Sequence, residues 1–187
     1  MSKIYVDEIA PKTTGGSITS TGLMPTGSVI QTVFTTPYLN GVTNPATSYM
    51  NTTSTSYVGT PATTGGYYID ITPTSTSSKI LVSVTHPAYC NGSYGYFVIK
   101  RSTDGGSTYT DVSDYDTSLS YESHAVTGNS MWMVQTYFHL DSPATTSSVR
   151  YGIHFKTNSS ASALTIGWSN ANTKHNSTML SAMEIAG

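Results

Sequence analysis

The chain has 187 residues, only 10% of them charged, and a formal net charge of −2. This length suits one domain with an appendage, and because Lys and Arg form no cluster, nucleic acid is not an expected partner. The single cysteine, Cys90, excludes an internal disulfide, and no apolar run reaches the roughly 20 residues that a membrane-inserted helix needs.

The first nine residues, MSKIYVDEI, form a short strand-like segment before a stretch rich in Thr, Gly and Pro. Asp7 and Glu8 interrupt its apolar residues, so it lacks the continuous apolar stretch of a secretory signal. A lone strand exposes unpaired backbone groups, which the edge of another protein's sheet would satisfy. We therefore expect an anchoring arm and linker over residues 1–27 and a β domain over residues 28–187. The predicted anchoring residues are Lys3, Ile4, Tyr5, Val6, Asp7, Glu8 and Ile9.

From residue 28 onward, apolar residues alternate with polar ones between turn-forming clusters, which predicts an all-β chain. About eight strands of this length are typical of an antiparallel β-sandwich or jelly roll. Residues 35–56 and 113–130 are predicted to be long loops, which often carry function. The expected strands cover 28–34, 66–72, 79–86, 94–101, 131–140, 148–156, 163–169 and 178–186.

Two of these strands show a clear inward face. In KILVSVTH the inward set is Ile80, Val82 and Val84. In SVRYGIHFK the inward set is Val149, Tyr151, Ile153 and Phe155, whereas Arg150, His154 and Lys156 are expected to point outward.

The strand MWMVQTYFHL carries large side chains on both faces. One face holds Trp132, Val134, Phe138 and Leu140, the set expected in the core. The other face is too apolar for open water and too polar for a deep core, so it suits burial against a second copy. The alternative is a core packed from both sides within one chain. The candidate oligomer interface consists of Met131, Met133, Gln135, Tyr137 and His139.

The stretch STDGGSTY, residues 102–109, resembles the Asp-box. The resemblance implies a hairpin turn in which Asp104 bonds the turn's backbone and Gly105 and Gly106 take positive φ. One copy in a chain too short for a propeller does not support a sialidase.

Motifs for catalysis and metal binding are absent from the sequence. The five histidines show no metal-ligand spacing, and no nucleophile elbow, phosphate loop or dinucleotide fingerprint occurs. Asp114, Asp116 and Glu122 crowd one predicted loop, where solvated acids are far commoner than catalytic ones. We expect no catalytic residue, no metal and no cofactor, and hence no enzyme.

The opening SKIYVDEIAPKTTGG resembles the N-terminal segment of tail-fibre and related appendage proteins of tailed bacteriophages, particularly those of marine bacteria. The later stretches PTGSVIQTV, ITPTSTSSKILVSV, FHLDSPATTSSVRYGI and STMLSAMEIAG are similar to a module of phage fibres and prophage proteins. Their order also resembles the trimeric jelly-roll heads of the complement and tumour-necrosis-factor type. The resemblance implies a homotrimer made in the host cytoplasm and attached to a tail, collar or adaptor protein of the virion.

The favoured function is therefore a short tail or collar fibre that contacts a glycan or protein on the host surface. The alternative is a decoration or cement protein of the capsid or tail that recognises no host. An enzyme that degrades surface polysaccharide ranks below both, since it needs a carboxylate pair within about 10 Å in a groove. Tyr offers flat contact area and a hydroxyl, so the receptor-contact candidates are the predicted loop residues Tyr89, Tyr94, Tyr115 and Tyr121.

Overall fold

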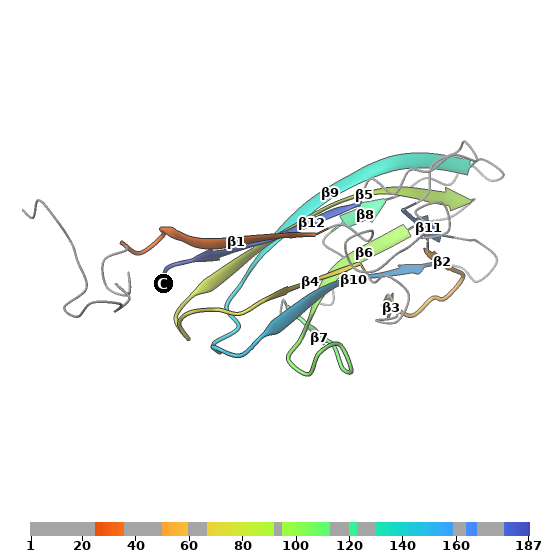
Figure 1. The fold of residues 1–187 in the computed structure, drawn as a ribbon. Coiled ribbons are helices and arrows are strands. Elements are labelled where there is room, and N and C mark those ends of the chain that lie inside the picture. The colour runs from red at the N-terminus through yellow and green to blue at the C-terminus, as the bar shows by residue number, and fades with distance from the viewer. Residues whose placement is uncertain are drawn as a thin grey trace, which may run out of the picture.

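A computed structural model describes residues 25–35, 50–59, 67–91, 95–112, 120–122, 130–158, 164–167 and 178–187. These residues form two antiparallel sheets and no helix, so the prediction of an all-β chain is confirmed (Figure 1). No helix in this part of the chain could cross a membrane. The predicted anchor, Lys3 to Ile9, lies outside the described residues.

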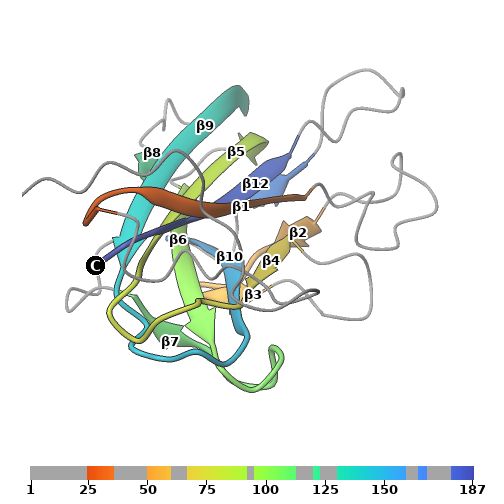
Figure 2. The same cartoon turned by 60° about the vertical axis from the view of Figure 1, so that its left-hand side comes forward.

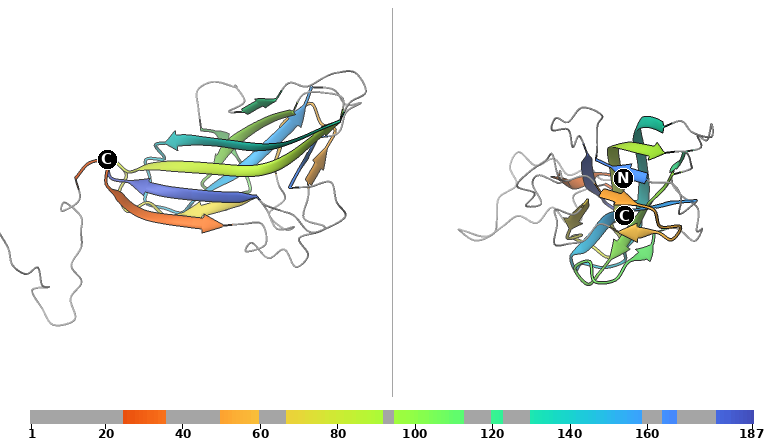
Figure 3. Two further views of the ribbon diagram at one scale, coloured as in Figure 1. Left: turned by 90° about the horizontal axis from the view of Figure 1, so that it is seen from above. Right: turned by 90° about the vertical axis from the view of Figure 1, so that its right-hand side faces the viewer.

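The first sheet, sheet A, is built around the long strand β5. β9 pairs with one side of β5, and β12 and then β11 pair with its other side. Four strands therefore lie side by side in the order β1-β12-β5-β9 (Figure 3). The strands of sheet A are β1 (Val29–Thr35), β2 (Met50–Thr52), β5 (Lys79–Asn91), β9 (Ser130–Asp141), β11 (Leu164–Ile166) and β12 (Met179–Ile185).

The second sheet, sheet B, packs against sheet A to make a sandwich (Figure 2). Its centre is β10, which pairs with β6 on one side and with β3 and β4 on the other. Its strands are β3 (Val58–Gly59), β4 (Tyr68–Ile71), β6 (Gly95–Ser102), β7 (Thr110–Asp111), β8 (Ser120–Glu122) and β10 (Val149–Thr157). The described residues thus hold twelve strands rather than eight. β2 and β8 occupy parts of the two predicted long loops, so those loop predictions were wrong at these positions.

The core lies between the two sheets and confirms both clear predictions of inward faces. Ile80, Val82 and Val84 are at most 1% exposed. Val149, Tyr151, Ile153 and Phe155 are fully buried. Burying each large apolar side chain of this kind stabilises the fold by about 1.5–3 kcal/mol.

The side of β9 that was expected to point into the core points outward, and the side expected to point outward is buried. Val134 and Phe138 are 70% and 71% exposed, whereas Gln135 and Tyr137 are buried within the chain. Tyr137 pairs directly with Val84 of β5, and directly opposed residues point to the same side of a sheet. Because Val84 faces the core, Tyr137 must do so as well. The candidate interface residues Gln135 and Tyr137 are therefore core residues of one chain.

His154, expected on the outside of β10, is only 5% exposed. The ring of Tyr109 covers it edge-on at 4.5 Å between centroids. Two glycines leave the space for this arrangement: a Cβ at Gly152 would lie 3.0 Å from Cε1 of Tyr109, and one at Gly59 would overlap the His154 ring. Burial lowers the pKa of His154 to about 4. Arg150 and Lys156 are half-buried at the outer face of sheet B.

The turn between β6 and β7 has the geometry that the Asp-box resemblance implies. Asp104 accepts hydrogen bonds from the backbone N–H of Thr108 at 2.9 Å and from its hydroxyl at 2.6 Å. The hydroxyl of Ser102 donates a third at 2.7 Å. Gly105 and Gly106 have φ of 73° and 98°, a region that favours glycine. The hydrogen bonds from Thr108 hold the pKa of Asp104 well below its usual range.

A buried carboxylate joins the two sheets at one edge of the sandwich. Asp141, at the end of β9, accepts hydrogen bonds from Nη1 of Arg101 at 2.9 and 3.0 Å and from the Tyr151 hydroxyl at 2.7 Å. Arg101 and Tyr151 belong to β6 and β10 of sheet B. Since hydrogen bonds to charged groups contribute about 1.5–3 kcal/mol, this network fixes the position of β9 relative to sheet B.

Candidate functional site

The outer face of sheet A is the most unusual surface among the described residues. Single exposed apolar residues are normal on a soluble protein, but a contiguous set marks an interaction site. All six of the large apolar side chains that the described residues expose belong to strands of this sheet. They are Val29, Phe34, Val134, Phe138, Leu140 and Met179.

The register of the strands arranges these side chains in rows. One row crosses the sheet from Phe34 through Ser181 and Ser83 to Phe138. The next row runs from Met179 through Thr85 to Thr136, where the two threonine hydroxyls are 3.1 Å apart. Small hydroxyl side chains thus form a floor between two lines of large apolar ones. We call this surface the sheet A face. It consists of the residues of the two rows and two further residues of β9: Phe34, Ser83, Thr85, Val134, Thr136, Phe138, Leu140, Met179 and Ser181.

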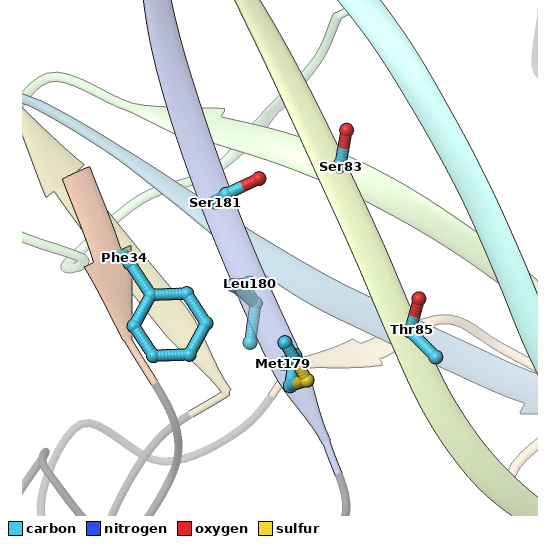
Figure 4. A pocket seen from close by; sticks show the side chains of 6 residues that line it. All are labelled: Phe34, Ser83, Thr85, Met179, Leu180 and Ser181. Carbon is cyan, nitrogen blue, oxygen red and sulfur yellow. The ribbon is translucent and has the colours of Figure 1, made fainter. Parts of the chain in front are cut away.

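One part of the sheet A face is hollowed. A shallow depression of about 120 Å³ lies beside Phe34 and Met179, over the serine and threonine floor (Figure 4). Its lining residues are Phe34, Ser83, Thr85, Met179, Leu180 and Ser181. At the other side of the same face, Val134 and Phe138 project from β9. The face therefore carries both a projection and a hollow.

Charge is nearly excluded from the sheet A face. Among the described residues of β1, β5, β9 and β12, the Lys, Arg, Asp and Glu residues are Lys79, Asp141 and Glu184. Asp141 and Glu184 are buried, and Lys79 is the first residue of β5. Depletion of charge together with exposed Phe and Met is the composition of the core of a protein interface.

The outer face of sheet B has the opposite character. Lys100 pairs with Asp111 at 2.9 Å, and Arg150 pairs with Asp70 at 2.7 Å. The Arg150 guanidinium also lies 3.7 Å from the ring centroid of Tyr68. Such ion pairs and half-buried cations are typical of a surface in contact with water. The sandwich therefore has one apolar outer face and one charged outer face.

Strand β9 adds an open edge to the sheet A face. In the part of the chain that the structure describes, β9 pairs with β5 alone, over 12 residues. Its other side presents backbone N–H and C=O groups that no described strand satisfies. A long edge with exposed apolar side chains promotes association unless a partner covers it.

A more polar hollow of about 390 Å³ lies at the edge between β6, β7 and β9. It brings together two carboxylates, those of Asp111 and Asp141. Each is already in an ion pair, with Lys100 and Arg101 respectively, and both oxygens of Asp141 are occupied. This arrangement does not present the unpaired acid and base that glycoside hydrolysis needs.

The remaining predicted site residues are scattered. Tyr89 is half-buried within β5, and Tyr121 belongs to β8, so neither lies in a loop as expected. Tyr94, Tyr115, Asp114 and Asp116 lie outside the described residues, as do the side chains of Met131, Met133, Tyr121 and Glu122. His139 is half-buried, with Nε2 3.1 Å from the carbonyl oxygen of Val112. No group of three His, Cys, Asp or Glu residues in the described ranges could hold a metal.

No protein-family model matches the chain, and no similar sequence was found among curated proteins. The class of the protein is therefore defined by its fold and surface: a two-sheet antiparallel β protein with one apolar outer face.

Proposed function

We propose that this chain is a homotrimeric structural protein of a bacteriophage virion, a short tail or collar fibre. Its N-terminal segment anchors it, and its β domain contacts the host surface. The observation that supports assembly into an oligomer is the apolar, nearly uncharged sheet A face, which lies beside the open edge of β9. Such a surface marks a site of association with a partner. The virion assignment comes from the resemblance of residues 2–16 and of the later stretches.

The strand order supports a jelly roll. Following the chain, β4 lies in sheet B, β5 in sheet A, β6 in sheet B, β9 in sheet A, β10 in sheet B and β12 in sheet A. The principal orders are β1-β12-β5-β9 and β4-β10-β6-β7. Repeated crossing between two four-stranded layers is the pattern of a double Greek key.

The shape of the sheet A face supports a ring. The projection formed by Val134 and Phe138 and the hollow beside Phe34 are different patches of one chain. A projection that enters the hollow of the next copy makes a head-to-tail contact, and such contacts close into rings when the rotation permits. Three copies is the number that the resemblance to trimeric heads implies.

The path of the chain supports an anchor at one end of the domain. The N–H of Gly27 donates to the carbonyl oxygen of Ala186 at 2.8 Å, and the N–H of Ala186 donates to that of Ser28 at 2.8 Å. The chain therefore enters the β domain beside residues 186–187 (Figure 1). An arm leaving from this end would leave the opposite end of the sandwich free to face outward.

Immunogold electron microscopy tests the function directly. Phage particles whose genome encodes this chain are labelled with an antibody against residues 28–187. We expect gold at the tail or collar, in groups that correspond to a few copies per particle. Label spread evenly over the capsid would favour a decoration protein instead. If the antibody detects the protein in lysates of infected cells but labels no particle, a role in the virion is contradicted.

A further inference from the structure

Two lysines and two tyrosines gather on the outer face of sheet B. The Nζ of Lys156 lies 4.2 Å from the ring centroid of Tyr57 and 5.3 Å from that of Tyr96. The Nζ of Lys100 lies 5.3 Å from the same Tyr57 ring. We call Tyr57, Tyr96, Lys100 and Lys156 the lysine–tyrosine cluster. Cations placed over aromatic faces in this way are attracted by the ring quadrupole, which fixes the ammonium groups in position.

Lys156 differs from the other cations of sheet B. Lys100, Arg101 and Arg150 each have a carboxylate partner within 3 Å. No carboxylate of the described residues lies within 4 Å of the Lys156 ammonium, which is held by the two rings instead. The cluster therefore has a positioned positive charge that the described protein residues do not neutralise.

The two ammonium groups also approach one ring. Charges interact more strongly near a protein surface than in bulk water. Asp111 offsets Lys100 only. Lys156 has no carboxylate partner among the described residues, so its charge is left to attract an anion, and the electrostatics of the cluster favour a negatively charged ligand.

The cluster lies at the opposite end of the β domain from residues 27 and 186, where the chain enters it (Figure 1). Lys156 pairs with Tyr96 near the start of β6, and Tyr57 immediately precedes β3. These segments are at the end of the sandwich opposite residue 187 (Figure 1). Tyr121, one of the receptor candidates from the sequence, is the cross-strand neighbour of Tyr96 on β8.

We propose that the lysine–tyrosine cluster binds an acidic saccharide, with a sugar carboxylate at the Lys156 ammonium. The sugar ring then packs on tyrosine, which combines flat apolar area with a hydroxyl that can bond to sugar hydroxyl groups. This inference rests on the proposed function, because assembly through sheet A would leave the outer face of sheet B uncovered, and the cluster lies at the end of the sandwich proposed to face outward.

Isothermal titration of the full-length protein tests the inference. The probes are trigalacturonic acid, its methyl ester, which keeps the rings but lacks the charge, and acetate, which keeps the charge but lacks the rings. The variants are Lys156→Gln and the matched control Lys79→Gln, which removes an exposed lysine of sheet A. We expect Lys156→Gln to weaken binding of the acid by about tenfold at about 20 mM salt, and Lys79→Gln to leave it unchanged. The ester and acetate are expected to bind at least tenfold more weakly than the acid.

Three results would overturn the inference. They are no binding of the acid by the unmodified protein, equal binding by the two variants, and binding of acetate or the ester as strong as that of the acid. Melting curves of both variants show whether they are folded, so a loss of binding is attributable to the missing charge. The mass of the same samples in solution is measured separately. A monomer that still binds the acid through Lys156 would contradict the trimer and leave the saccharide site standing.

Discussion

Replacement of Phe138 by aspartate is expected to convert the assembled protein into monomers. Phe138 is 71% exposed in one chain and projects from the edge strand β9, so its loss would remove apolar contact from every interface of the proposed ring. The new carboxylate would also be buried without a partner. Replacing a central, fully covered residue of an interface costs about 2–4 kcal/mol of binding free energy. The dissociation constant should therefore rise by at least roughly 30-fold, as measured by sedimentation velocity over a series of concentrations.

Thr103→Asp is the matched control for this prediction. Thr103 is exposed in the turn after β6, on the sheet B side of the molecule, so the same charge is added away from the sheet A face. We expect this variant to keep the mass of the unmodified protein. If Phe138→Asp keeps that mass as well, the sheet A face is not the subunit interface.

Lowering the pH from 6.5 to 4 is expected to destabilise the protein steeply. Burial lowers the pKa of both His86 and His154 from 6.5 to about 4. Between these values the unfolded chain binds a proton at each position and the folded chain does not. Stability is therefore full above pH 6.5 and is lost as the pH falls. Each histidine contributes a slope of about 1.4 kcal/mol per pH unit, so the two together should cost roughly 6 kcal/mol by pH 4.

Urea unfolding at several pH values, at one protein concentration, measures this slope. The His86→Phe variant separates the two contributions. His86 is fully buried, its ring packs 4.7 Å from that of Phe97, and its Nε2 has no hydrogen-bond partner among the described residues, so phenylalanine should be tolerated there. We expect His86→Phe to halve the slope. An unchanged slope, or a flat profile between pH 6.5 and 4.5 in the unmodified protein, would show that His86 is not buried in its neutral form.

The sequence was sufficient to predict strands with one polar and one apolar side. In residues 80–84 and 149–155 the alternation gives both the strand and its inward face. In residues 131–140 both faces carry large side chains, so the alternation predicts the strand but not which of its two faces points into the core. Which face of β9 points into the core depends on its pairing with β5, where Val84 lies opposite Tyr137. That pairing joins residues more than 50 positions apart, and no local pattern contains it.

Long-range contacts also explain the other differences between prediction and structure. β2 and β8 have three residues each, and such short strands are defined by their partners rather than by their own sequence. His154 is buried because Tyr109, from the turn between β6 and β7, folds over it. The sheet A face was missed because Phe34 and Met179 come from opposite ends of the chain. Only the order β1-β12-β5-β9 brings them together with Phe138.

The most direct test of assembly through the sheet A face is the mass of the protein in solution, measured by sedimentation equilibrium at micromolar concentration. The full-length chain of 19.9 kDa and a version that lacks residues 1–27 are measured side by side. Both are predicted to have three times the mass of their own chain, because the proposed interface lies in the β domain and the proposed role of the arm is anchoring. If both proteins are monomers at the highest concentration tested, the trimer is contradicted. The result would then favour a protein that is organised only by the surface to which it binds.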